Sequence, residues 1–252
     1  MINVFIHNSV IMEKYMTTDY VSAIIPCAGC GSRMNVEGNK NHLPVNNLPI
    51  LAHTLKAFDR VSMLDEIIIV YREGERELTE EVVSLAKIDK PYKLVVGGDY
   101  RQTSVYNGLK SVDARCSVVV VHDGARPLIT TELIEKTIVE AKRVGAVSLA
   151  VRAKETYAFS EDNAISEAID RSKLYAVQTP QTFSYDVLSR AYAKAIEDNF
   201  LESATDDTTL VKRSGGRVEL VEGSYSNIKI TTPEDLVLAN IILSERENSD
   251  KD

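Results

Sequence analysis

The chain has 252 residues, of which 44% are hydrophobic and 26% charged, fractions typical of globular proteins rather than of disordered, collagen-like or disulfide-rich chains. A net charge of -8 leaves no basic surplus for a nucleic-acid backbone, and no apolar run approaches the roughly 18 residues that span a membrane. We therefore expect neither nucleic acid nor membrane as a partner. Three cysteines, and an N-terminus with Glu13 and Asp19 but no basic start, favour a cytoplasmic location.

Short apolar runs alternate with stretches of helical period from residue 21 onward, a pattern that predicts an α/β fold. We expect a mostly parallel, Rossmann-like sheet with helices on both faces, because the apolar runs lack polar alternation and so favour strands covered on both sides. The predicted strands are 21–26, 66–71, 93–96, 117–122 and 146–151. The predicted helices between them are 50–60, 77–87, 103–111 and 131–144.

The pattern changes after residue 151. Residues 154–169 contain two short, half-polar pieces around a turn-forming segment at 160–163, which predicts a hairpin that leaves the body of the protein. No repeat, linker or change of composition divides the chain. We therefore predict an N-terminal extension at 1–20, one domain at 21–245 with a protruding β-arm at about 152–176, and a tail at 246–252.

Further elements follow the arm. A helix is predicted at 186–198, an acidic segment at 205–207 and a strand at 218–222. The last helix has a clear start, because Thr232 can cap it, Pro233 occupies its first turn, and Glu234 and Asp235 complement its positive end. This helix is predicted to end at about residue 244.

The first strand is followed by a segment of small residues, PCAGCGSRM at 26–34. Glycines at a strand end let backbone N–H groups approach a phosphate. Arg33 and Lys40 would add the positive charge that a nucleoside triphosphate needs, the first as a planar fork and the second as a point charge. Because ligands of α/β proteins bind at the carboxyl edge of the sheet, the segment predicts a triphosphate site there.

The same segment allows other interpretations. A dinucleotide fingerprint would need a third glycine where Met34 stands, and the phosphate loop of NTPases would need Ser or Thr where Asn41 follows Lys40. Cys27 and Cys30 form a CxxC pair, which could be a redox pair or half a metal site, or could simply fill positions that require small residues.

Two more strand ends carry polar motifs. Gly97 and Gly98 precede Arg101 and Ser104 at the start of a helix, where free N–H groups and the arginine could face an anion or a base; a tight turn with a solvated arginine is the alternative. Asp123 follows the most apolar strand, where a carboxylate needs a cation. Mg²⁺ is the leading candidate, and a pair with Arg126 or a cap of the next turn is the alternative. His122 beside it is assigned to structure.

Six motifs in this order, at 26–34, 97–109, 121–127, 169–171, 178–181 and 227–231, resemble the 2-C-methyl-D-erythritol 4-phosphate cytidylyltransferase family. The resemblance extends over residues 21–242 and implies the nucleotide-diphospho-sugar transferase fold. Two places differ from the family pattern: Asn39-Lys40-Asn41-His42 stands where Pro-Lys-Gln and an aromatic residue are usual, and Ser226 stands where an acidic residue is common.

The resemblance also implies site residues and partners. Arg33, Lys40 and Lys229 would be catalytic, Asp123 would hold Mg²⁺, and the substrate phosphate and sugar would meet Thr156, Arg171 and Thr179. The CTP-binding residues would be Ala28, Gly29, Gly31, Gly98, Asp99, Arg101, Ser104 and Gly124. In this family the arm crosses to a second subunit, so a homodimer is implied in which Thr156 and Arg171 complete the partner's site.

The implied reaction moves CMP from CTP to 2-C-methyl-D-erythritol 4-phosphate, a polyol phosphate, and yields CDP-methylerythritol and pyrophosphate for isoprenoid precursor synthesis by the non-mevalonate route. An ionised phosphate needs no general base, and the sequence has no convincing Ser-His-Asp or Cys-His set. The alternatives are a ribitol-5-phosphate cytidylyltransferase of cell-wall or capsule synthesis and a nucleotide-binding protein without catalysis.

Overall fold

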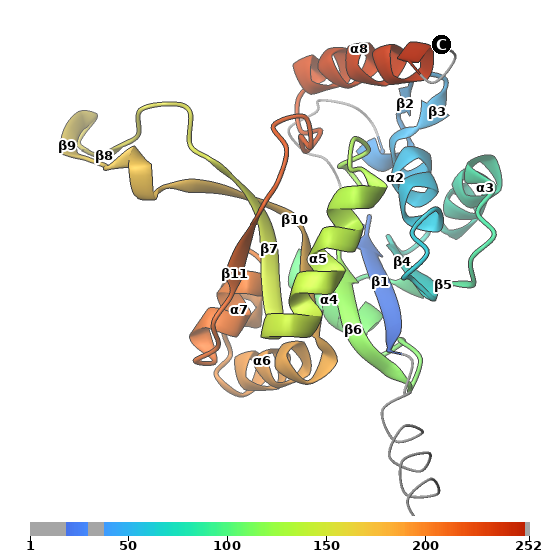
Figure 1. The fold of residues 1–252 in the computed structure, drawn as a ribbon, viewed down its shortest axis with the longest axis horizontal. Helices are drawn as coiled ribbons and strands as arrows, with labels where there is room; N and C mark the ends of the chain where they lie inside the picture. Colours follow the sequence, from blue (N-terminus) through green and yellow to red (C-terminus); the bar gives the residue numbers. More distant parts are fainter. Residues whose placement is uncertain (1–18, 30–37, 250–252) are drawn as a thin grey trace, which may run out of the picture.

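The structure of the protein is a computed structural model that describes residues 19–29 and 38–249. Its largest feature is a seven-stranded sheet at the centre of the molecule (Figure 1). The strands of this sheet are β1 (Tyr20–Pro26), β4 (Glu66–Tyr71), β5 (Tyr92–Val96), β6 (Cys116–Val121), β7 (Ala146–Arg152), β10 (Tyr175–Ser184) and β11 (Glu219–Glu222). The order across the sheet is β11-β7-β10-β6-β1-β4-β5, and β10 alone runs antiparallel to its neighbours.

Helices cover both faces of the sheet. They are α2 (Ile50–Asp59), α3 (Arg76–Ala86), α4 (Arg101–Leu109), α5 (Thr131–Val144), α6 (Tyr185–Glu197), α7 (Asp207–Arg213) and α8 (Pro233–Ser249). Because successive strand side chains point to opposite faces, Ala23 and Ile25 of β1 pack with α2, α3 and α5, whereas Ile24 packs with α4, α6 and α7. The α/β fold with a mostly parallel sheet is confirmed.

The predicted elements agree with the structure to within one or two residues at most ends. β4 and α5 have the predicted bounds. One expectation holds only in part: β5 lies at the edge of the sheet, and among the described strands it pairs with β4 alone. Leu94 and Val95 pack partly against the two opposite cores, but Tyr92 and Val96 are exposed. An edge strand has a neighbour on one side only, so its coverage is incomplete.

The sequence did not predict β10 as a strand, although it singled out residues 178–181 as a motif. Polar residues and Pro180 interrupt the apolar pattern, and proline is disfavoured in a central strand. The ladder between β10 and β7 shifts its register between Val177 and Gln181, so Pro180 lies in the irregular part of the pairing. The acidic segment at 205–207 also proved to be the beginning of α7.

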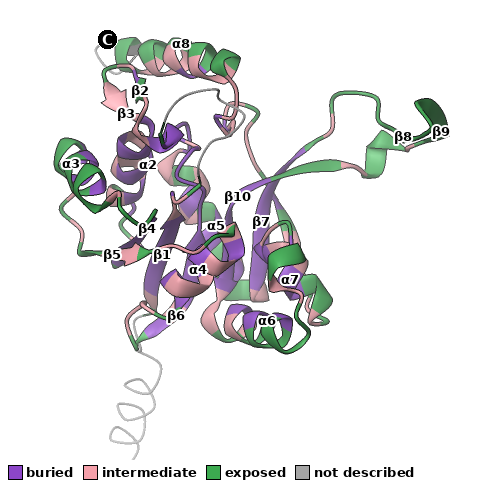
Figure 2. Cartoon of the chain, turned by 180° about the vertical axis from the view of Figure 1, so that it is seen from behind, coloured by how far each residue is buried: buried purple, intermediate pink, exposed green. Residues whose placement is uncertain are grey.

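The predicted hairpin is formed by β8 (Ala158–Glu161) and β9 (Ala164–Ala168), which pair with each other. Every residue of both strands is exposed, and the hairpin projects away from the sheet (Figure 2).

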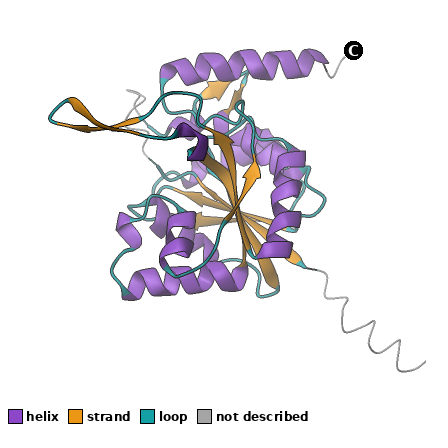
Figure 3. Cartoon of the chain, turned by 60° about the vertical axis from the view of Figure 1, so that its left-hand side comes forward, coloured by secondary structure: helices purple, strands orange, loops and turns teal. Residues whose placement is uncertain are grey.

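The last helix, α8, runs five residues past its predicted end and lies across the end of the molecule from which the hairpin projects (Figure 3). Asp235 accepts the backbone N–H groups of Thr231 and Thr232 at its start. Within the described ranges, no helix has the length and apolar character needed to cross a bilayer.

A test of the packing concerns Gly108, where α4 lies against the sheet. A Cβ there would lie 2.6 Å from Cγ2 of Ile24 and 3.0 Å from Cγ2 of Val70. We expect Gly108→Val to lower the free energy of unfolding by about 1 to 3 kcal/mol, because the branched methyl groups cannot move aside in a close-packed core. Urea unfolding of the variant and of the wild type measures the difference in free energy of unfolding. Lys110→Val, at an exposed position just beyond the same helix, is the control, and equal effects of the two changes would contradict the close approach.

Candidate functional site

A pocket of about 680 Å³ opens at the carboxyl ends of the parallel strands. It lies where β1 has β6 on one side and β4 on the other, the point from which the chain builds the sheet in opposite directions. The residues that line it are Pro26, Ala28, Gly29, Lys40, Asn41, Arg72, Glu73, Gly97, Gly98, Asp99, Tyr100, Arg101, Ser104, Asp123, Ala125, Lys229 and Thr231.

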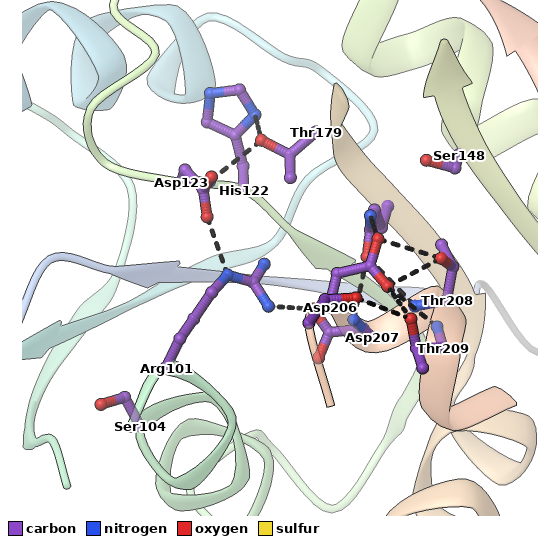
Figure 4. A network of polar contacts seen from close by, with 12 residues as sticks. Arg101, Ser104, His122, Asp123, Ser148, Thr179, Asp206, Asp207, Thr208 and Thr209 are labelled. Atoms are coloured by element: carbon purple, nitrogen blue, oxygen red, sulfur yellow. Dashed lines mark hydrogen bonds and ion pairs between the residues drawn. The ribbon is translucent and has the colours of Figure 1, made fainter. Parts of the chain in front are cut away.

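The carboxylate of Asp123, directly after β6, is the centre of charge in this pocket (Figure 4). Nε of Arg101 lies 2.9 Å from Oδ1, Nζ of Lys229 lies 2.8 Å from Oδ2, and Nε of Arg126 lies 3.9 Å from Oδ2. Burial alone would raise the pKa of Asp123, but the three cations outweigh it and hold the pKa well below its usual range. The group is therefore a carboxylate at any physiological pH.

Arg101 joins this carboxylate to a second one beneath the pocket. Its Nη1 lies 2.7 Å from Oδ2 of Asp207, which also accepts the hydroxyl of Tyr192 at Oδ1. Gln181 of β10 accepts the backbone N–H of Asp207 and donates its amide to Asp206. Arg101, at the start of α4, is thereby fixed to β10, α6 and α7.

Two lysines reach the pocket from distant segments. Lys40 lies in the short 3-10 helix η2 (Lys40–His42), is 8% exposed, and donates from Nζ to the carbonyl of Ile230 at 2.6 Å. Lys229, the residue before Ile230, pairs with Asp123. The N–H of Ile230 donates to the carbonyl of Ala125, so both lysines are placed relative to the loop that follows β6.

Most of the predicted site residues that the structure describes line this one pocket. They are Ala28, Gly29, Lys40, Gly98, Asp99, Arg101, Ser104, Asp123 and Lys229. The predicted Gly31 and Arg33 lie outside the described residues. The predicted roles of all these residues remain predictions.

Four predicted residues do not line the pocket. Gly124 lies behind its wall, where a Cβ would approach Cys27 and Leu51 to 3.1 Å. Thr179 is buried, and its hydroxyl oxygen accepts the backbone N–H of Asp123. Thr156 and Arg171 are exposed in the arm.

The CxxC interpretation requires an easily ionised thiol. Cys27 is 1% exposed and donates from Sγ to the carbonyl of Val70, and burial raises the pKa of its thiol. Cys30 lies outside the described residues. Cys27 therefore does not fit the redox alternative and agrees with the other interpretation, in which it fills a small-residue position of the core.

A divalent cation is compatible with the donor set. In nucleotide sites Mg²⁺ usually takes one or two carboxylates and completes its ligands with phosphate oxygens and water. Asp123 offers an ionised carboxylate on the pocket wall, and each oxygen has a second lone pair besides the one its cation uses. The described residues contain no cluster of three or more His, Cys, Asp or Glu side chains, so a metal here would depend on the nucleotide for its other ligands.

The sequence did not single out Arg72, Asp207 or Tyr192 as site residues. Arg72 lies on the pocket wall after β4. Asp207 and Tyr192 lie beneath the pocket. Asp207 belongs to the acidic segment at 205–207, for which the sequence indicated no role, and Tyr192 is one polar residue within a helical pattern. Arg126 was proposed as a possible partner of Asp123, and it is the most distant of the three cations.

A pocket at the carboxyl edge of a mostly parallel sheet, with cations gathered around Asp123, is the ligand site of an α/β protein, the class to which this chain belongs. The model of the 2-C-methyl-D-erythritol 4-phosphate cytidylyltransferase family matches residues 21–245. The chain belongs to this family.

Individual relatives carry the name of the same family. The 2-C-methyl-D-erythritol 4-phosphate cytidylyltransferase of Caldanaerobacter subterraneus is 47% identical over 226 residues, covering 88% of this chain and 98% of the relative. That of Desulforamulus reducens is 46% identical over 228 residues, covering 90% and 97%. The crystal structure of 4-diphosphocytidyl-2C-methyl-D-erythritol synthase from Anaerococcus prevotii superposes with a TM-score of 0.80 at 34% identity, over 90% of this chain and 97% of the other.

The support beneath the pocket can be tested at Tyr192. Tyr192→Phe removes a hydrogen bond to the fully buried carboxylate of Asp207, and we expect it to lower the free energy of unfolding by about 1.5 to 3 kcal/mol. Chemical denaturation measures the loss. Tyr106→Phe removes a hydroxyl from the ring stacked on Tyr192 and should change stability by less than about 0.5 kcal/mol. A loss at Tyr192 no larger than at Tyr106 would contradict the importance of this bond.

Proposed function

We propose that the protein is a cytidylyltransferase that transfers CMP from CTP to 2-C-methyl-D-erythritol 4-phosphate, with CDP-methylerythritol and pyrophosphate as products. Membership of the family supports the reaction. The observation that carries the proposal is the convergence of Lys40, Lys229 and Asp123 on one pocket at the switch point of the sheet. The product would serve isoprenoid precursor synthesis.

The chemistry follows from the charges. An oxygen of the phosphomonoester forms a new bond to the α-phosphorus of CTP, and the bond from that phosphorus to the α–β bridging oxygen breaks, releasing pyrophosphate. Both reactants are anions, so the site must offset their repulsion and hold them in line. Lys40 and Lys229 both line the pocket and supply fixed positive charge there. No side chain needs to act as nucleophile or base, because the attacking phosphate is already ionised.

We divide the proposed CTP-binding residues into two sets. Ala28, Gly29 and Lys40 line the pocket and are assigned to the triphosphate, together with Gly31 and Arg33 of the same sequence segment. Gly98, Asp99 and Ser104 also line it and are assigned to cytosine and ribose. Arg101 acts mainly through Asp123, because its guanidinium is already paired with two carboxylates. Gly124 contributes by being small behind the wall.

Mg²⁺ is the proposed cofactor, with Asp123 as its protein ligand. When bound with the triphosphate, the ion would neutralise charge on the phosphate oxygens. The chain's own contribution is to keep Asp123 ionised and fixed between Arg101 and Lys229.

The acceptor end of the site is proposed to need a second copy of the chain. Thr156 and Arg171 are exposed on the arm and lie away from the pocket of their own chain, and Arg171 donates to the carbonyl of Lys154. An isolated two-stranded hairpin is only marginally stable, so a partner surface is expected for β8 and β9. We propose a homodimer in which the arm carries Thr156 and Arg171 to the partner's pocket, while Thr179 supports Asp123 from behind.

An acceptor screen tests the function. Purified protein with CTP and Mg²⁺ should release pyrophosphate with 2-C-methyl-D-erythritol 4-phosphate and much more slowly with ribitol 5-phosphate. Coupled phosphate detection measures the release. Faster turnover with ribitol 5-phosphate would favour the other cytidylyltransferase, and CTP binding without release would indicate a nucleotide-binding protein.

Two variants test the site. Lys40→Ala should lower kcat about 10² to 10³-fold, the usual loss when a preorganised positive donor is removed. Arg171→Ala should raise the KM for the polyol phosphate more than that for CTP, whereas Lys173→Ala, at the exposed neighbouring position on the arm, should change neither. Steady-state kinetics measure both. Unchanged kinetics of the Lys40 variant, with circular dichroism like that of the wild type, would contradict its role.

Mixing these variants tests the dimer. If arm and pocket come from different subunits, heterodimers of Lys40→Ala and Arg171→Ala contain one site with both residues intact, and activity should partly return. Mass spectrometry of differently tagged chains would verify subunit exchange. Exchange without recovered activity would contradict a shared site.

A further inference from the structure

The segment that carries Lys40 is held by two buried asparagines. Asn39 and Asn41 are 6% and 3% exposed. Both donate from Nδ2 to the carbonyl of Cys27 at the end of β1, at 2.7 and 3.0 Å. Oδ1 of Asn39 accepts the backbone N–H of Asn41 at 3.0 Å, which caps the short helix η2. The backbone of Lys40 is thus fixed between two side chains tied to the sheet.

Asn39 makes one further contact, outside this segment. Its Nδ2 also donates to Oε2 of Glu75 at 2.7 Å. Both amide protons and the amide oxygen are therefore in use, and the amide can face only one way. A flipped amide would place its oxygen against the carbonyl of Cys27 and a carboxylate.

Glu75 lies where the chain leaves β4 and enters α3. Its side chain is 14% exposed, its N–H donates to the carbonyl of Arg72, and its own carbonyl accepts the N–H of Thr79. Its second carboxylate oxygen lies 3.8 Å from Nη1 of Arg72, which lines the pocket. Glu75 is thus fixed by its own backbone and connects the pocket wall after β4 with the segment of Lys40.

We propose that Asn39 and Glu75 form a positioning pair that sets the place of Lys40 in the pocket. The bond between them is charge-assisted and nearly excluded from water, which makes it short and directional. Without it, Asn39 would keep only its bonds within the segment and to Cys27, and the segment could rotate about those bonds. The inference rests on the proposed role of Lys40 in nucleotidyl transfer.

The main test compares three variants near the start of α3. Glu75→Ala removes the acceptor, Glu75→Gln keeps an acceptor oxygen, and Glu77→Ala is a matched exposed control on the same helix. We expect Glu75→Ala to lower kcat about 10- to 100-fold with little change in the KM for CTP, since a small displacement of a catalytic group has effects of this size. Glu75→Gln should retain most of the turnover, and Glu77→Ala all of it. Equal kcat for Glu75→Ala and Glu77→Ala would overturn the proposal.

A double-mutant comparison separates positioning from general damage to the fold. In a Lys40→Ala background, Glu75→Ala should cause no further loss, because the group it positions is absent. A second, equally large loss in that background would show that Glu75 acts independently of Lys40 and would overturn the proposal.

Asn39 gives a second route if Glu75→Ala does not fold. Asn39→Asp is nearly isosteric but places a carboxylate against Glu75 and the carbonyl of Cys27, and kcat should fall. Adding Glu75→Gln supplies a donor to the new carboxylate and should restore part of kcat. Absence of any rescue, with thermal unfolding of the double variant like that of the wild type, would count against the pair.

A labelling experiment keeps this inference separate from the proposed function. Acetylation with an N-hydroxysuccinimide ester, followed by peptide mass spectrometry, reports how accessible the amine of Lys40 is without any need for turnover. Labelling of Lys40 should accelerate in Glu75→Ala and remain slow in Glu75→Gln, with Lys87 beyond α3 as internal reference. Slow labelling in both would overturn the pair. Fast labelling in Glu75→Ala, with no pyrophosphate release by the wild type, would support the pair and contradict the proposed function.

Discussion

A carboxylate buried at the end of a central strand can persist only if cations meet it. Asp123 satisfies this constraint with Arg101, Arg126 and Lys229, which come from three separate stretches of the chain. Removing a charge from water is costly unless a partner compensates it, and a buried charge left without its partner is strongly destabilising. The start of α4, the loop after β6 and the loop before α8 must therefore meet at one point. The pocket is the space that this meeting leaves open.

The antiparallel strand β10 extends the constraint into the second half of the fold. Its Gln181 fixes the backbone of Asp207, and Asp207 in turn holds Arg101 from below. Because Asp123 and Asp207 both bear on its guanidinium, Arg101 stays charged although it is largely buried, and its pKa is held above its ordinary value. Tyr192 completes the support from α6. β10, α6 and α7 therefore contribute to the site without lining it, whereas the loop before α8 lines it with Lys229 and Thr231.

The sequence allowed prediction of those parts of the fold whose pattern is local. β4 and α5 follow from apolar runs and helical spacing. Asp123 follows from a polar residue at a strand end, and Lys40 from a basic residue a few positions beyond a segment of small residues. The exposure of β5 could not be predicted, because an edge strand is defined by a missing neighbour and not by its own composition. The partners of Asp207 escaped for a related reason: a contact between residues 106 positions apart leaves no local pattern.

The two lysines are held in place by bonds within the protein itself. Lys40 donates to the carbonyl of Ile230, while Lys229, one residue earlier, pairs with Asp123. A single stretch of backbone thus sets the spacing of both cations, and the bond from Ile230 to Ala125 ties that stretch to the loop after β6, which carries the carboxylate. Charges that are already oriented need no rearrangement when two anions approach each other. Lys40 is nearly buried, and its bond to the carbonyl of Ile230 fixes the orientation of its amine.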